Sequence, residues 1–232
     1  MRRQSRWLAL LLLIGGVFTC LGILLYLVKR EPAFYTATLP SPDWEDSLVK
    51  SASLATRIQD LKTEIRSKKE WGDKFSAADL NCFFAENLRP KGGLYDILPE
   101  KTHSPRLAIE GDRVKLGFRY GQGFWSAVVW IELRIWLVAN ERNLVGVEVC
   151  DLRAGSLPLG TQSILDSITE SARDSNIEVT WYRNGSNPVG LFRFFAGQAQ
   201  ATSQILTLMV TDGKIVVAGR SDLEPATVAA TP

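Results

Sequence analysis

Residues 125–139, with the sequence WSAVVWIELRIWLVA, decide the fold, because every second position from Trp125 to Leu137 is apolar. This period of two is typical of a β-strand that rests one face on a core. A strand of that length would extend roughly 50 Å at about 3.3 Å per residue, well beyond a typical strand. We therefore expect it to twist and curve, or to break at a β-bulge.

The opposite face of this strand carries a candidate binding patch, formed by Trp130, Glu132, Arg134 and Trp136. Tryptophan and arginine are enriched at interaction hot spots. A surface ion pair between Glu132 and Arg134, flanked by the two rings, explains the same residues without a ligand. Apolar residues on both faces of the strand are also explained by a core that buries both sides, because surplus apolar residues usually belong to a core.

Further segments with the strand period surround this stretch. They cover residues 106–109, 114–120, 145–149, 177–181, 189–195, 206–210 and 216–218. Turn sequences separate most of them, among them Asp212-Gly213, a dipeptide typical of type I′ hairpins. Consecutive hairpins predict a single antiparallel sheet of seven or eight strands.

Three segments have helical periodicity instead. Residues 41–72 form a predicted amphipathic helix with a narrow apolar stripe, which packs on the body or pairs with a second copy as a stalk. Ser76 and Asp79 resemble a capping box at the start of a second helix. A third helix is expected at 161–173, so two or three helices are available to pack on the sheet.

Residues 7–28 contain no charge, and a bilayer core needs about 20 apolar residues. Three arginines precede this run, while Lys29 and Arg30 follow it, which predicts a cytoplasmic N-terminus. The alternative is a cleaved signal peptide, but its apolar region is only about 7–15 residues long. We therefore expect an uncleaved, single-pass anchor in the cell (inner) membrane, with the body extracytoplasmic.

These patterns predict an α+β protein with an N-terminal transmembrane helix and a long curved antiparallel sheet packed on helices. The expected segments are a cytoplasmic N-terminus at 1–6, a transmembrane helix at 7–28, a linker at 29–40, an amphipathic helix at 41–72, an α+β extracytoplasmic domain at 73–220 and a disordered tail at 221–232.

The charge balance limits the classes of partner. The 232 residues hold 27 Lys+Arg and 25 Asp+Glu, a net charge of +2, which argues against a nucleic-acid binder. Residues 31–232 alone carry a net charge of −3, so the body has no general attraction to anionic lipid. One histidine and three cysteines make a metal site improbable, and no cofactor is predicted.

Few residues in the sequence are candidates for catalysis or for a disulfide. His103 lies in a predicted loop, and no nucleophile-elbow pattern exists to pair with it, so we predict a protein without catalytic activity. Cys82 and Cys150 form a disulfide in an oxidising compartment or remain two buried free thiols. Their spacing leaves both options open.

Three features occur in order: Phe75-Ser76, then Leu80-Asn81 at a helix start, and residues 155–158 (Gly-Ser-Leu-Pro) before another helix. With the single span, they resemble the YpmS-like family of single-span bacterial envelope proteins. The likeness covers most of the chain after the anchor. The predicted helix at 42–70 and the run Cys82-Phe83-Phe84 depart from it. The resemblance implies a place outside the cytoplasm and carries over no catalytic residues.

Two functions are consistent with these expectations. The first is a membrane-anchored module that binds a lipid or another apolar envelope ligand. The alternative is a structural subunit of a cell-envelope assembly, which docks through the helix at 41–72 and the face carrying Trp130 and Trp136.

Overall fold

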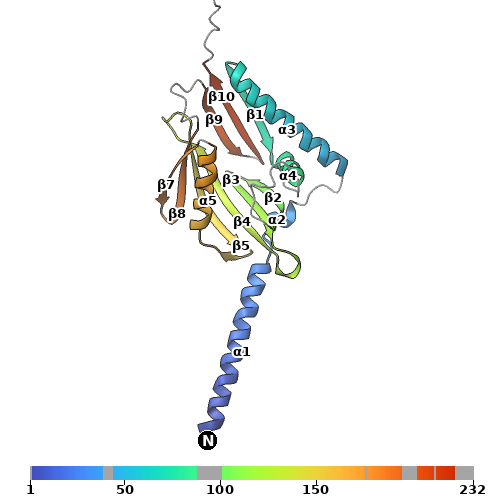
Figure 1. The fold of residues 1–232 in the computed structure, drawn as a ribbon, viewed down its shortest axis with the longest axis vertical. Helices are drawn as coiled ribbons and strands as arrows, with labels where there is room; N and C mark the ends of the chain where they lie inside the picture. The colour runs from blue at the N-terminus through green and yellow to red at the C-terminus, as the bar shows by residue number, and fades with distance from the viewer. Residues whose placement is uncertain are drawn as a thin grey trace, which may run out of the picture.

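The computed structural model of the chain describes residues 2–38, 44–87, 101–175, 177–194, 203–211 and 213–222. A long helix, α1 (Arg2–Lys29), projects from an α+β body (Figure 1). Residues Leu11–Lys29 of α1 are apolar enough to cross a membrane, and none of this segment is buried in the body. The predicted α+β class and the apolar N-terminal helix are therefore confirmed.

The body is built around a seven-stranded antiparallel sheet, as predicted. Its strands are β2 (Thr102–Glu110), β3 (Arg113–Tyr120), β4 (Ala127–Leu137), β5 (Leu144–Ala154), β6 (Leu157–Pro158), β7 (Glu178–Asn184) and β8 (Asn187–Arg193). The order is β2-β3-β4-β5-β8-β7, with β6 paired to β5. The register between β4 and β5 shifts between Glu132 and Leu133, and the extra residue, Cys150, lies in β5. The strand β4 itself runs without a break from Ala127 to Leu137, shorter than the predicted 125–139.

A second, three-stranded sheet contains β1 (Glu70–Ser76), β10 (Lys214–Ser221) and β9 (Ser203–Thr211), in that order. The prediction of one continuous sheet was therefore wrong for the last two strands. They pair with β1 instead. The residues of β1 were predicted to form the end of the amphipathic helix (41–72) and the start of the α+β domain (73–220). Only Trp71 and Phe75 in β1 are large and apolar, so its alternation is weak in the sequence.

The long amphipathic helix is shorter than predicted. As α3 (Trp44–Ser67) it ends before β1, and residues 41–43 lie outside the described part of the chain. It packs against α4 (Ala77–Asn87), β1 and β10, with Leu54 only 1% exposed. Its apolar stripe is therefore used on the body of the same chain.

The remaining helices flank the large sheet. The helix α4 begins as predicted, because the Asp79 backbone N–H donates to Ser76 Oγ over 3.1 Å. The third predicted helix is α5 (Gln162–Asp174). A short helix, α2 (Ala33–Ala37), lies in the segment predicted as a linker. Ser221, predicted to open the tail, ends β10 and is buried, while 223–232 lie outside the described residues.

The apolar face of β4 forms the core. Ile131 packs with Val149, Leu152 and Leu165 of α5. At the other end of the sheet, side chains from β2, β3, β9 and α4 form a second cluster, which includes Leu107, Ile109, Val114 and Val210. The helices α4 and α5 and the small sheet therefore cover one face of the large sheet. The other face, which we call the polar face, bears the predicted patch.

Candidate functional site

The two tryptophans of the predicted patch lie on the polar face, but both are engaged in packing. The Trp130 ring stacks edge-on against Phe34 of α2, with centroids 5.8 Å apart, and its Nε1 donates to the Gly155 carbonyl over 2.8 Å. Trp136 lies over Gly146 of β5 so closely that a Cβ there would overlap the indole. Neither ring stands free on the surface.

The two charged residues of the patch pair with neighbouring strands. Arg134 Nε lies 2.9 Å from Asp112 Oδ2, while Glu132 carboxylate oxygens lie 3.7 Å from Arg113 Nη1 and 3.9 Å from Lys115 Nζ. The patch is thus part of a lattice of ion pairs across β3 and β4. Ion pairs of this exposure contribute little to stability.

Cys82 and Cys150, for which the sequence leaves a disulfide and two free thiols open, are free thiols in the structure. Cys82 lies on α4, over the apolar face of the sheet, whereas Cys150 accepts a hydrogen bond from Arg113 on the polar face. The sheet separates them, and this is the physical reason they do not pair. Burial raises the pKa of the Cys150 thiol, against the lowering effect of Arg113.

His103 is not assembled into a catalytic or metal centre by its described neighbours. It lies in β2, with Nδ1 3.4 Å from the Lys101 carbonyl oxygen. Within the described ranges, no three His, Cys, Asp or Glu side chains are placed to hold a metal ion.

A different site lies where α1 enters the body. The Ser156 N–H donates to the Leu27 carbonyl over 2.8 Å, and Lys29 Nζ donates to the Ser126 carbonyl over 2.7 Å. Gly155 has φ 58°, and a Cβ on it would overlap the carbonyl oxygens of Leu27 and Val28. The last turn of α1, whose carbonyls need partners outside the helix, is therefore docked on the β5–β6 turn.

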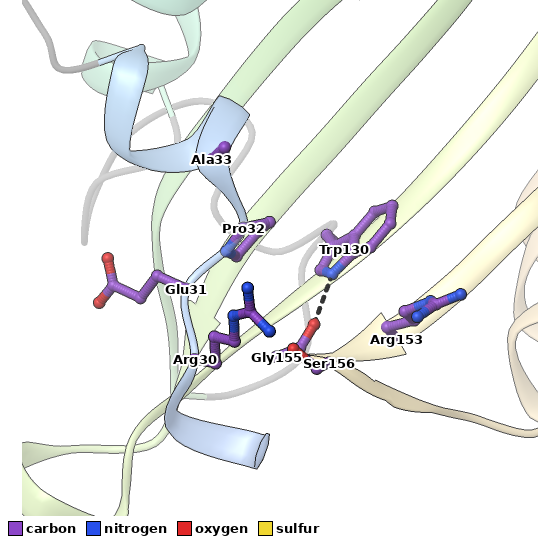
Figure 2. Close-up of a pocket in the computed structure, with 8 residues that line it drawn as sticks. All are labelled: Arg30, Glu31, Pro32, Ala33, Trp130, Arg153, Gly155 and Ser156. Atoms are coloured by element: carbon purple, nitrogen blue, oxygen red, sulfur yellow. Dashed lines mark hydrogen bonds between the residues drawn. The ribbon is translucent and has the colours of Figure 1, made fainter. Parts of the chain in front are cut away.

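Beside this junction lies an open pocket of about 290 Å³. It is lined by Arg30, Glu31, Pro32 and Ala33 of the α1–α2 connection, Trp130 of β4, and Arg153, Gly155 and Ser156 (Figure 2). Figure 2 shows Arg30 pointing toward Trp130 and Glu31 pointing away from it. Segments that are more than a hundred residues apart in sequence thus meet where the anchor leaves the body.

The charged residues in the lining of the pocket are two arginines, Arg30 and Arg153, and one acid, Glu31. Glu31, the one acid in its lining, is paired with Arg119, and this hydrogen bond raises the pKa of the Arg119 guanidinium. Arg153 lies over the Trp130 ring at 5.9 Å and bonds to Asp151 through Nε alone, over 2.7 Å. The Arg30 side chain has no hydrogen bond or ion pair with the described residues. The guanidinium groups of Arg30 and Arg153 therefore both have N–H donors that can bind a ligand.

The sequence carried little signal for this pocket. Arg30 is predicted only as a flanking charge of the span, and Arg153 lies beyond the strand predicted at 145–149 and has no predicted role. An arginine directly after an apolar run is common, and only the docking of α1 on residues 155 and 156 brings the two arginines to one pocket.

No protein-family model, curated protein or solved structure matches this chain. The resemblance to the YpmS-like family stays a prediction, and the function is argued below from the geometry of the junction.

Proposed function

We propose that the protein is a single-span, membrane-anchored module without catalytic activity, which binds the anionic headgroup of a lipid beside its own anchor. One observation carries the proposal: a pocket with two available guanidinium groups opens at the exit of a helix that is apolar enough to cross a membrane. The apolar face of the sheet is used as core, so the ligand belongs at the junction rather than on the sheet.

The chemistry of the lining suits a phosphate group. Guanidinium groups bind phosphate through two parallel N–H···O bonds. Arg30 and Arg153 supply such donors, and the Ser156 side chain adds a hydroxyl at the same pocket. Because Glu31 is paired with Arg119, its charge is compensated and does not oppose an anion.

The size of the pocket favours a headgroup over a whole lipid. Small-molecule sites have volumes of about 300–1,000 Å³, and this pocket, at about 290 Å³, lies just below that range. A phosphate-bearing headgroup would occupy it, while the acyl chains would stay in the bilayer alongside α1. Binding would hold one lipid at a fixed place next to the anchor.

The proposed location follows from the flanking charges. The arginines before the span favour a cytoplasmic N-terminus, which sets the body and its pocket on the outer side of the cell (inner) membrane. The ligand would then be a lipid of the outer leaflet.

The alternative, a subunit that docks through its long helix and the tryptophan-bearing face, has weaker support. Val49 on α3 is 68% exposed, but Leu54 of the same helix is buried on the body. Trp130 and Trp136 are both packed within the chain. Less apolar surface is left for a partner than the sequence predicted.

The test uses the full-length protein, purified in mild detergent and exposed to equal amounts of phosphatidylglycerol and phosphatidylcholine. Native mass spectrometry then counts the retained lipids. We expect one tightly retained phosphatidylglycerol in the wild type and its loss in Arg30→Gln/Arg153→Gln. The double variant Arg183→Gln/Arg193→Gln, which changes the net charge equally on β7 and β8, should keep the lipid.

Further arms separate the outcomes. Inorganic phosphate at millimolar concentration should displace the lipid only if the phosphate group alone accounts for binding. Equal retention by the wild type and both double variants would show that lipid adheres to α1 without the pocket. That result, or no retained lipid at all, would contradict the proposed function.

A further inference from the structure

Two aromatic side chains in the connection between β3 and β4 stand out by their exposure. Trp125 is 82% exposed and Phe124 is 64% exposed, at the end of a short 3₁₀ helix (Gly123–Trp125). Their rings meet edge to face, with centroids 5.4 Å apart. Because burying a large aromatic side chain is favourable, such an exposed pair indicates a contact outside the folded body.

The last residue of α1 fixes where this pair lies. Lys29 Nζ donates to the backbone carbonyls of Phe124 and Ser126, and it sits 4.8 Å from the centre of the Phe124 ring. The aromatic pair is therefore held at the height of the final turn of α1. Figure 1 shows the β3–β4 connection at the end of the body that α1 enters.

The length of α1 relates this height to a membrane. Its 28 residues span about 42 Å at 1.5 Å per residue, close to the total thickness of a bilayer with its headgroups, about 40–45 Å. The uncharged run at 7–28 spans about 33 Å, near the hydrocarbon thickness of about 30 Å. Lys29, and with it Phe124 and Trp125, then falls in the interfacial layer.

The composition of the loop suits that layer. Residues 120–129 contain no charged side chain, and the Lys29 ammonium beside them is bonded to their backbone carbonyls. Tryptophan prefers the membrane interface. Tyr26, one turn before Lys29 on the same side of α1, is 67% exposed and adds a third aromatic ring near this level.

We propose that Phe124 and Trp125 insert into the interfacial layer of the bilayer that α1 crosses, as a second membrane contact of the body. The contact uses a different segment from the headgroup pocket, and it rests on the proposed membrane anchoring, not on headgroup binding. With two contacts, α1 and this loop, the body is held in one orientation on the membrane surface.

The test places a photoreactive benzoylphenylalanine at single positions of the full-length protein in phosphatidylcholine vesicles. Positions 124 and 125 probe the loop. Leu21 in the span, which is 55% exposed, is the positive control, and Leu206 on β9, which is 51% exposed, is the control away from the membrane. All four side chains are at the surface, so the replacement disturbs little packing. Mass spectrometry identifies what each position crosslinks.

We expect phosphatidylcholine adducts at 21, 124 and 125, with yields at 124 and 125 several-fold above the yield at 206. Adducts at 21 but only background at 124 and 125 would overturn the loop contact and leave the anchor intact. Crosslinks from 125 to a second copy of the chain would overturn it as well. No adduct at 21 would refute the span on which the inference rests.

Discussion

Lys29 Nζ lies 2.7 Å from the carbonyl oxygen of Ser126, so the last residue of α1 is bonded to a segment 97 residues further along the chain. A helix C-terminus has carbonyls without intrahelical partners. Here the Leu27 carbonyl accepts the Ser156 N–H. The end of α1 is therefore built into the body, and changes at this junction should be measurable in the stability of the whole protein.

The close approach of Gly155 to α1 gives the first prediction. Gly155→Ala imposes φ 58° on a residue with a Cβ and creates an overlap with the Leu27 and Val28 carbonyls. Gly111→Ala imposes nearly the same φ, 59°, but in open space. We expect Gly111→Ala to lose about 1–2 kcal/mol and Gly155→Ala to lose clearly more, in denaturant unfolding of the full-length protein. Equal losses of stability in the two variants would mean that α1 and the β5–β6 turn move apart to accept the new Cβ at no energetic cost.

Asn81 gives the second prediction, because its amide satisfies the backbone of Leu107 on β2, an edge strand. Asn81 Nδ2 donates to the Leu107 carbonyl, and Oδ1 accepts the Leu107 N–H, both over 2.7 Å. We expect Asn81→Ala to lower the free energy of unfolding by about 2–3 kcal/mol, since two backbone groups lose their partner.

The matched control for this prediction is Asn87→Ala on the same helix. Among the described residues, the Asn87 amide donates only to the Phe83 carbonyl of the same helix. Its removal should change the stability by no more than about 0.5 kcal/mol. Similar losses in the two variants would show that the bond to β2 is not what matters.

A third prediction concerns the link between the two sheets at Asn143. Its side chain donates to the Ser203 carbonyl and accepts the Ile205 N–H, both over 2.8 Å. Because its φ is 54°, glycine keeps the backbone conformation and removes only these bonds. We expect Asn143→Gly to lose about 2–3 kcal/mol in thermal or denaturant unfolding.

Asn140 provides the comparison, because it is exposed and has φ 65° in the same turn. Asn140→Gly should leave the unfolding midpoint nearly unchanged. A drop as large as that of Asn143→Gly would point to the turn itself rather than to the bonds that reach β9.

The fourth prediction is a pH dependence at Cys150. Burial raises the pKa of this thiol above its ordinary value of 9.0, so the folded protein disfavours the thiolate. In a Cys20→Ser/Cys82→Ser background, the rate of alkylation by iodoacetamide should reach half its maximum above pH 9.0, and at lower pH after unfolding in urea.

The raised pKa of Cys150 also makes the stability of the protein depend on pH. The protonated thiol of Cys150 contributes to the free energy of unfolding. This contribution is fully present below the pKa of the thiol in the unfolded chain, and it is lost as pH rises through the higher pKa of the folded protein. Alkylation of the folded protein with the same midpoint as in urea would show that the thiol is open to solvent.

The sequence predicted those elements whose signals are local. The capping bond of Ser76, the helix α5 and the alternating strand β4 follow from spacing and alternation within a few residues. The strand β1 was missed because its partner lies about 140 residues later and its own alternation is weak. The candidate site depended on a backbone contact between Gly155 and α1, which leaves no pattern in the sequence.

The small sheet has a consequence for how the protein is made. Its central strand, β10, is the last of the described strands to be synthesised, and it pairs Arg220 with Glu70 of β1. Until residue 221 leaves the ribosome, β1 has no sheet partner, and contacts of such long sequence separation form slowly. Completion of the body therefore waits for the whole described chain.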